Sequence, residues 1–147
     1  MIFSGSESGG RMLSELTLKV LEGKYAVSKL APDDPFPLWA DAFGDFTSIT
    51  RTAEELSVVC PENRLPEKLD AERDWRIIKI EGILDFSLVG ILAALASVLS
   101  GAGISIFAVS TYNTDYILVR ETALEKAVLV LKEAGYRLQE APDRRKV

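Results

Sequence analysis

The chain has 147 residues, of which 48% are hydrophobic and 27% are charged, so it carries enough apolar side chains to bury a core. Its net charge of -5 at pH 7 excludes the basic surface with which proteins usually bind nucleic acid. The longest apolar run, 88–99, is shorter than the roughly 20 residues that cross a bilayer, so no membrane partner is expected. The single cysteine, Cys60, excludes an internal disulfide and favours a reducing, cytoplasmic location.

The first predicted strands follow a tail rich in glycine and serine. Residues 1–12 lack the charged and apolar parts of a signal peptide and have the composition of a flexible tail, so we expect the fold to begin after them. The apolar run 16–21 leads through Glu22-Gly23 into a second β-forming run, 25–30. This pattern predicts a hairpin that adds a strand to the first unit of the fold.

The rest of the first half has room only for short helices. A short helix is expected around 37–43, with Trp39 and Phe43 on its core face because they lie four residues apart. A hairpin is expected over 46–60. Prolines interrupt the segment between Cys60 and Trp75, so a full second helix is not expected there.

The second half shows a clearer alternation of strands and helices. Residues 75–80 are rich in β-forming side chains and predict a strand, and 87–100 predict a helix that is apolar nearly all round. Asp85 or Ser87 is expected to cap the start of that helix, and the glycines that follow residue 100 are expected to end it.

A second hairpin and a second helix complete this half. Two β-forming runs within 104–120 flank the polar turn Thr111-Tyr-Asn-Thr-Asp115. A capping box, Thr122-Ala-Leu-Glu125, opens a helix that Gly135 ends, and a last strand is expected over 136–140. The inward face of this helix is expected to carry Leu124, Ala127, Val128 and Leu131.

The order βαββαβ over 74–140 predicts an α+β fold, in which an antiparallel sheet carries both helices on one face. Residues 141–147 are expected to be a tail.

A weak internal repeat organises the first half: 25–30 align with 75–80 at an offset of 50, and 46–60 align with 106–120 at an offset of 60. Because the offset grows by ten, the first copy lacks room for a full helix. We therefore expect 13–73 to be a truncated relative of the second unit.

The hairpin motif Ser110-Thr-Tyr-Asn-Thr-Asp-Tyr-Ile-Leu-Val119, within a βαββαβ unit that follows a shortened copy, resembles the ACT-domain family. It is most similar to the tandem-ACT group, which includes small bacterial ACT proteins, the regulatory ends of aspartate kinases and the Castor-type arginine sensors. The resemblance covers about 13–140 and implies a ferredoxin-like fold. It also implies regulation, because ACT domains pair side by side and bind a small effector, usually an amino acid, between units.

The resemblance further implies where the ligand binds. In Castor-type sensors the ligand lies between the loop that opens the first helix and the Thr-aromatic-x-Thr-Asp turn of the hairpin. Here the turn corresponds to Thr111, Tyr112 and Asp115, and the loop to about 85–91. The acidic residue that Castor-type sensors use in this region has no clear counterpart in 86–91, so arginine specificity is not carried over.

The chemistry of a free amino acid suits the same residues. Its ammonium needs an anion such as Asp115, and its carboxylate suits the free amides at the start of the 87–100 helix. Gly82 allows a close approach of the backbone, and Tyr112 suits an apolar side chain. The alternative is that the turn is only a turn and Asp115 is a solvated acid. The predicted ligand-binding residues are Gly82, Asp85, Phe86, Ser87, Leu88, Ser110, Thr111, Tyr112 and Asp115.

Three other polar or reactive positions give weaker indications of a functional site. Asp33 and Asp34 lie in a proline-rich loop and are interpreted as solvated acids rather than metal ligands. Glu55 aligns with Asp115 and is interpreted as a turn residue, with a second ligand site as the alternative. Cys60 lies in an apolar run, which favours a small core residue over a reactive thiol.

The sequence predicts no enzyme. It has no histidine, no Gly-rich phosphate loop, no soft-metal ligand set and no nucleophile beside a base, so no cofactor, metal or catalytic residue is expected. We expect a non-catalytic regulatory protein that binds a small molecule of the amino-acid class and forms a homodimer through its apolar helix. The alternative is a protein-interaction or assembly subunit whose ligand site is degenerate.

Overall fold

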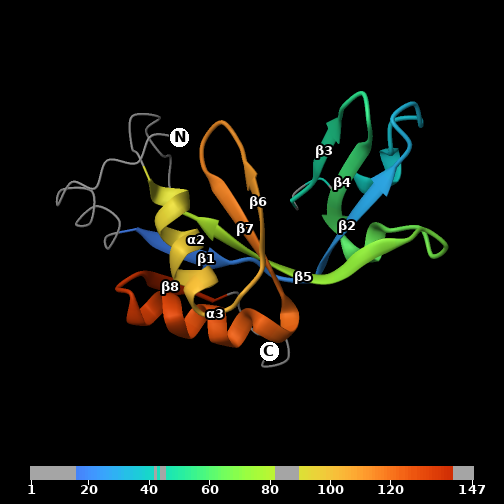
Figure 1. The fold of residues 1–147 in the computed structure, drawn as a ribbon. Helices are drawn as coiled ribbons and strands as arrows, with labels where there is room; N and C mark the ends of the chain where they lie inside the picture. The colour runs from blue at the N-terminus through green and yellow to red at the C-terminus, as the bar shows by residue number, and fades with distance from the viewer. Residues whose placement is uncertain (1–15, 42, 44–45, 82–89, 141–147) are drawn as a thin grey trace. The chain divides into compact units, whose positions relative to one another are not determined.

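The computed structural model describes residues 16–41, 43, 46–81 and 90–140. They form two compact units (Figure 1). The inserted unit is Gly23–Trp75, and the main unit consists of the described residues before and after it. Neither helix in these described ranges combines the length and the apolar character that a membrane crossing requires.

The main unit has the predicted order of strands and helices. Its sheet order is β6-β7-β5-β1-β8, and α2 and α3 contact each other. The α+β, ferredoxin-like fold class is therefore confirmed. The elements are β1 (Thr17–Val20), β5 (Ala71–Ile80), α2 (Ile91–Gly101), β6 (Ile106–Ser110), β7 (Asp115–Arg120), α3 (Glu121–Glu133) and β8 (Arg137–Gln139).

The position of β1 differs from the prediction. The expected hairpin between β1 and the next strand is wrong, because β1 pairs antiparallel with β5 and parallel with β8. Leu18 and Val20, on alternate positions of β1, are buried in the core of the main unit. This burial stabilises β1 between the first and last strands of the βαββαβ order and makes one strand pair of the sheet parallel.

The starts of both helices also differ from the prediction. Helix α2 begins at Ile91 rather than at 87, and its N-cap is Gly90, with φ 80°. Only glycine adopts this left-handed conformation without steric cost, so α2 starts at the residue that follows it. Helix α3 begins at Glu121 directly after β7, which places Thr122 inside the first turn. The predicted capping box therefore does not form, and Arg120 occupies the N-cap position without a side-chain bond.

The core of the main unit lies between the sheet and the two helices. Alternate residues of each central strand point into it, among them Ile78 and Ile80 of β5. The predicted inward face of α3 is confirmed, because Ala127, Val128 and Leu131 are buried and Leu124 packs beside them. The larger members of the core cluster are Leu18, Ile78, Ile80, Leu95, Leu99, Ile117, Val119 and Leu131.

The inserted unit repeats the strand order of the main unit without a counterpart of β1, and its connections are shorter. Its sheet order is β3-β4-β2-β5, in which the first half of β5 takes the place of the last strand. Between Cys60 and Trp75 its only helical segment is a 3₁₀ turn, as expected from the prolines. Its elements are β2 (Tyr25–Leu30), η1 (Leu38–Ala40), β3 (Ser48–Arg51), β4 (Leu56–Pro61) and η2 (Glu62–Arg64).

The short helix η1 spans fewer residues than predicted. It ends at Ala40, so Phe43 lies beyond it and is fully exposed, with a relative exposure of 103%. The prediction that Phe43 faces the core is therefore wrong. Trp39 does pack against the small core formed by residues such as Ala26, Leu56 and Val58.

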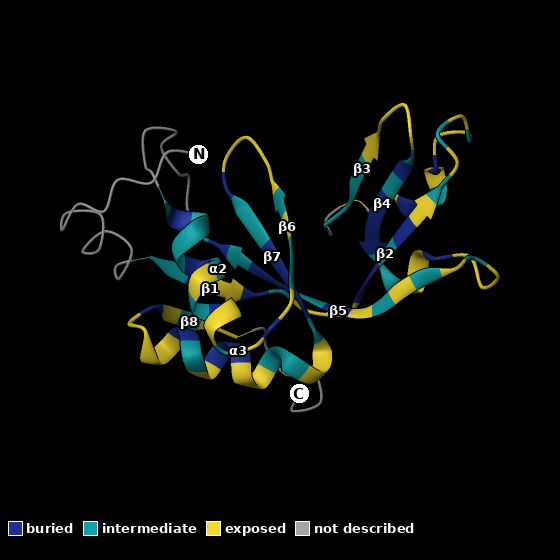
Figure 2. Cartoon of the chain, in the orientation of Figure 1, coloured by how far each residue is buried: buried dark blue, intermediate teal, exposed yellow. Residues whose placement is uncertain are grey.

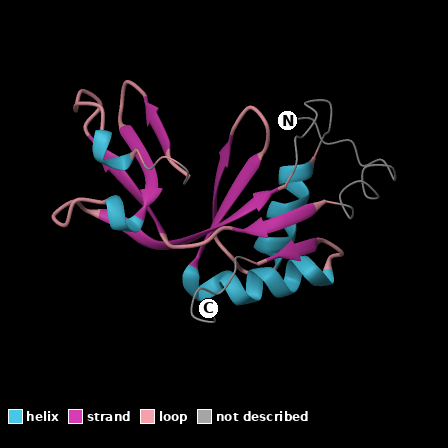
Figure 3. Ribbon diagram, turned by 180° about the vertical axis from the view of Figure 1, so that it is seen from behind, coloured by secondary structure: helices cyan, strands magenta, loops and turns pink. Residues whose placement is uncertain are grey.

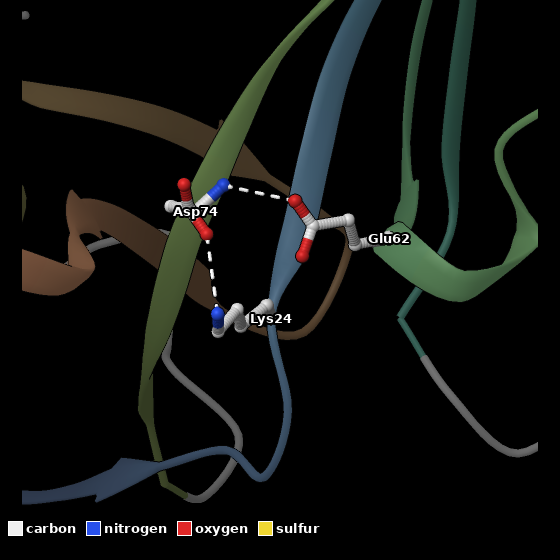
Figure 4. A network of polar contacts seen from close by, with 3 residues as sticks. All are labelled: Lys24, Glu62 and Asp74. Atoms are coloured by element: carbon white, nitrogen blue, oxygen red, sulfur yellow. Dashed lines mark hydrogen bonds and ion pairs between the residues drawn. The ribbon is translucent and has the colours of Figure 1, made fainter. Parts of the chain in front are cut away.

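A polar cluster joins the start of β2 to β5 within the inserted unit (Figure 4). Asp74 has φ 62°, a left-handed conformation that few residues other than glycine, asparagine and aspartate adopt. Its amide donates to Glu62 Oε1 at 3.3 Å, and its carboxylate lies 3.3 Å from Lys24 Nζ. Burial along β5 rises from this region toward its end, where the strand enters the core of the main unit (Figure 2).

Cys60 is buried in the core of the inserted unit, as predicted. Burial raises the pKa of its thiol to about 11, whereas an unfolded chain ionises its thiol near about 8.5. Between these pH values the unfolded state releases a proton that the native state keeps, so rising pH favours unfolding. We expect the free energy of unfolding in urea to fall from about pH 8 to about pH 10.5, and to fall less in Cys60→Ala. An equal fall in both proteins would show that the Cys60 thiol does not cause the loss of stability.

Candidate ligand-binding turn

The turn between β6 and β7 is closed by backbone and side-chain hydrogen bonds. The last pair of the two strands is Ser110 with Asp115. The Thr111 amide donates to the Thr114 carbonyl at 2.8 Å, and the Thr111 hydroxyl donates to the same carbonyl at 3.0 Å. The hydroxyl also accepts from the Thr114 amide at 3.4 Å. Thr111 therefore holds the turn in one conformation and presents the residues between itself and Thr114.

The predicted turn residues differ in exposure. Ser110 and Thr111 are exposed, Tyr112 is 82% exposed, and Asp115 is half-buried at the start of β7. Within the part of the chain that the structure describes, the Asp115 carboxylate takes part in no ion pair. The structure therefore brings together Ser110, Thr111 and Asp115 at one end of the hairpin, with an uncompensated carboxylate and an aromatic ring beside them.

Thr114 has a role that sequence reasoning missed. It is only 4% exposed, and its hydroxyl donates to the Ile80 carbonyl at 2.7 Å. Ile80 is the last residue of β5, so this bond ties the turn to the point where the chain leaves that strand. The Ile80 carbonyl lies 34 residues away in the sequence. Nothing in the local sequence distinguishes Thr114 from an ordinary turn threonine.

The inserted unit contains a matching turn. The Thr52 amide donates to the Glu55 carbonyl at 2.8 Å, and the Glu55 amide donates to the Thr52 hydroxyl at 3.1 Å. Thr52 therefore corresponds to Thr111, an offset of 59 rather than 60. The predicted pairing of Glu55 with Asp115 is wrong by one residue, because Glu55 occupies the place of Thr114.

This shift removes the basis for a second site at Glu55. The residue that matches Asp115 is Leu56, which pairs with Arg51 as Asp115 pairs with Ser110. Leu56 is fully buried and apolar. The inserted unit therefore lacks a carboxylate at this position of its turn.

The helix side of the predicted site is only partly described. Gly82, Asp85, Phe86, Ser87 and Leu88 lie outside the described residues. Because α2 begins at Ile91, the free amides at its start belong to Ile91 and the residues after it, not to 86–88. Gly90 provides no side chain to cap them.

Metal binding finds no support among the residues described. No group of acidic, histidine or cysteine side chains in those ranges is arranged to hold a metal ion. What the turn offers is one carboxylate, two hydroxyls and backbone groups, which suits a small polar ligand carrying a positive charge.

Comparisons with known proteins agree with this fold. The ACT-domain family model matches residues 70–133, and a model described as an N-terminal domain matches residues 23–68. No curated protein sequence matches.

Among solved structures, a protein from Agobacterium tumefaciens is 40% identical, with a TM-score of 0.82, over 88% of this chain and 96% of its own. A Vibrio cholerae protein of unknown function, described as a possible transport protein, is 21% identical, with a TM-score of 0.75, over 90% and 99% of the two chains. The regulatory subunit of aspartate kinase from Thermus thermophilus is 14% identical, with a TM-score of 0.54, over 78% and 93%.

The fold and the turn together define a small α+β protein with a ferredoxin-like sheet. The chain belongs to the ACT-domain family.

Proposed function

We propose that this chain is a non-catalytic, cytoplasmic regulatory protein that binds a free amino acid beside the turn 111–114. The observation that carries the proposal is the hydrogen bond from Thr114 to the Ile80 carbonyl, at 2.7 Å. It holds the turn next to Ile80, the last residue of β5. Membership of the ACT-domain family supports a regulatory role.

The arrangement of the main unit supports the same site. The turn between β6 and β7 and the start of α2 lie at the same end of this unit (Figures 1 and 3). In the proposed complex the ligand ammonium binds Asp115. The carboxylate binds backbone amides at the start of α2, at Ile91 and Leu92, where the helix dipole favours an anion. Tyr112 closes over the ligand side chain.

A thermal-shift screen over the twenty amino acids tests the proposal. A ligand that binds only the native state raises the unfolding temperature by mass action, so one or a few amino acids should stabilise the protein. If none of them shifts the transition, the proposal fails, and an assembly subunit with a degenerate site is the better description.

Asp115→Asn tests the position of the site. Asparagine suits the same turn, so the fold should persist, but the variant loses a charge-assisted hydrogen bond worth about 1.5–3 kcal/mol, or roughly ten- to a hundredfold in affinity. Calorimetry with the amino acid found in the screen measures the change. Glu55→Gln is the matched control, because Glu55 lies in the corresponding turn without corresponding to Asp115. Unchanged affinity in Asp115→Asn, or an equal loss in the control, would place the ligand elsewhere.

We also propose that the protein is a homodimer. Helix α2 is almost wholly apolar, and Leu92 and Val98 remain only partly buried within one chain. Burying these side chains against a second copy would remove apolar surface from water. Light scattering at tens of micromolar should give about twice the chain mass of 16.1 kDa, and a particle of one chain mass would contradict the proposal.

A further inference from the structure

A charged residue lies on the core face of β5 in the main unit. Side chains alternate along a strand, so Arg76 points to the same face as Ile78 and Ile80, both of which are buried. Its guanidinium donates from Nη2 to the Leu21 carbonyl at 3.3 Å. Its Nε is buried and has no hydrogen-bond partner among the described residues. A buried donor without a hydrogen-bond partner destabilises the folded state. We therefore take the arginine at position 76 to serve a purpose other than packing.

Arg76 borders a hollow of about 390 Å³ within the main unit. Its apolar lining comes from Val20 of β1 and from Leu124 and Val128 of α3. Pockets of roughly 300–1,000 Å³ that combine apolar walls with a few polar groups are typical of small-molecule sites. The volume of this hollow is sufficient for a ligand of amino-acid size.

The helix side of the hollow carries the opposite charge. Glu121, Leu124, Glu125 and Val128 follow one another at helical spacing, so a single face of α3 lines the hollow with two carboxylates and two apolar groups. Glu140 also borders the hollow, and its Oε1 lies 4.0 Å from Lys132 Nζ.

Two opposite charges in the hollow have no ion-pair partner in the described part of the chain. These are the Arg76 guanidinium, from the sheet, and the Glu125 carboxylate, from the helix. They line the same hollow without pairing with each other. A ligand that carries a carboxylate and an ammonium close together can satisfy both, whereas an anion alone or a cation alone satisfies one.

The geometry points to a second binding site, for a free amino acid with an aliphatic side chain, in the hollow between β5 and α3. The ligand carboxylate binds the Arg76 guanidinium, its ammonium binds Glu125, and its side chain contacts Val20, Leu124 and Val128. This site is separate from the turn at 111–114 and does not depend on it.

Calorimetry with L-leucine tests the proposal. We expect leucine to bind the full chain, and 4-methylpentanoate and 3-methylbutylamine, which each lack one of its charges, to bind at least about tenfold more weakly. Arg76→Gln and Glu125→Gln should each weaken leucine binding about ten- to a hundredfold. Glu125 is exposed on α3, so Glu125→Gln is expected to fold even where Arg76→Gln does not.

Two controls separate this site from the turn. Glu133→Gln changes an exposed acid of α3 that does not line the hollow, and it should bind leucine as the unchanged protein does. Asp115→Asn should also leave leucine binding unchanged. The proposal is overturned if leucine does not bind at millimolar concentration, or if Glu125→Gln binds it normally. It is also overturned if Asp115→Asn alone abolishes binding, a result that would instead support the turn.

Discussion

Replacing Leu95 by alanine is expected to lower the free energy of unfolding by about 2–5 kcal/mol. Leu95 lies in the middle of α2, is fully buried, and belongs to the core cluster that joins both helices to the sheet. Alanine removes apolar surface from this core and leaves a cavity that close-packed neighbours fill only in part. Urea unfolding followed by circular dichroism measures the loss.

Leu129→Ala is the matched control for this prediction. It makes the same chemical change on α3, but Leu129 is 55% exposed. Its side chain gains little from folding, so its removal should change the free energy of unfolding by only about 0.5 kcal/mol. Equal losses in the two variants would show that α2 does not pack in the core as described.

Replacing Thr114 by valine is expected to cost about 1–3 kcal/mol of stability and to weaken ligand binding at the turn. Valine has nearly the shape of threonine but lacks the hydroxyl that donates to the Ile80 carbonyl. The carbonyl then loses a buried partner, and the turn is no longer tied to the end of β5. Urea unfolding measures the first effect, and calorimetry with the amino acid found in the screen measures the second.

Thr114→Ser separates the hydrogen bond from the shape of the side chain. Serine keeps the hydroxyl and loses one methyl group, so it should retain most of the stability and affinity that valine loses. If serine and valine have equal effects, the methyl group rather than the bond to Ile80 holds the turn.

The order of strands and helices in the second half was predictable because its signals are local. Strand residues over 75–80, the apolar helix that glycines end, and the polar turn in the hairpin each depend on neighbours within a few positions. The ends of the helices were less predictable. Gly90 and the direct passage from β7 into α3 moved both starts, since capping depends on the path by which the chain enters a helix.

The alignment of the two turns shows how a small error in register changes a functional conclusion. Offsets judged from side-chain similarity paired Glu55 with Asp115. The hydrogen bonds of the turns pair Thr52 with Thr111 instead. Because successive residues in a strand point to opposite faces, a shift of one residue replaces a half-buried carboxylate by a buried leucine.

Strand and helix types, the hairpin and the ACT family resemblance follow from the sequence, because propensity, periodicity and turn chemistry act over short stretches of chain. The place of β1, the bond from Thr114 to Ile80 and the hollow beside Arg76 do not. Each joins residues far apart in the chain: β1 lies between two strands that follow it by more than fifty residues, and Arg76 borders a hollow whose other wall is α3. Such contacts form between surfaces that distant segments present to one another. Several pairings of these surfaces compete, and the packing of the whole chain decides which of them forms.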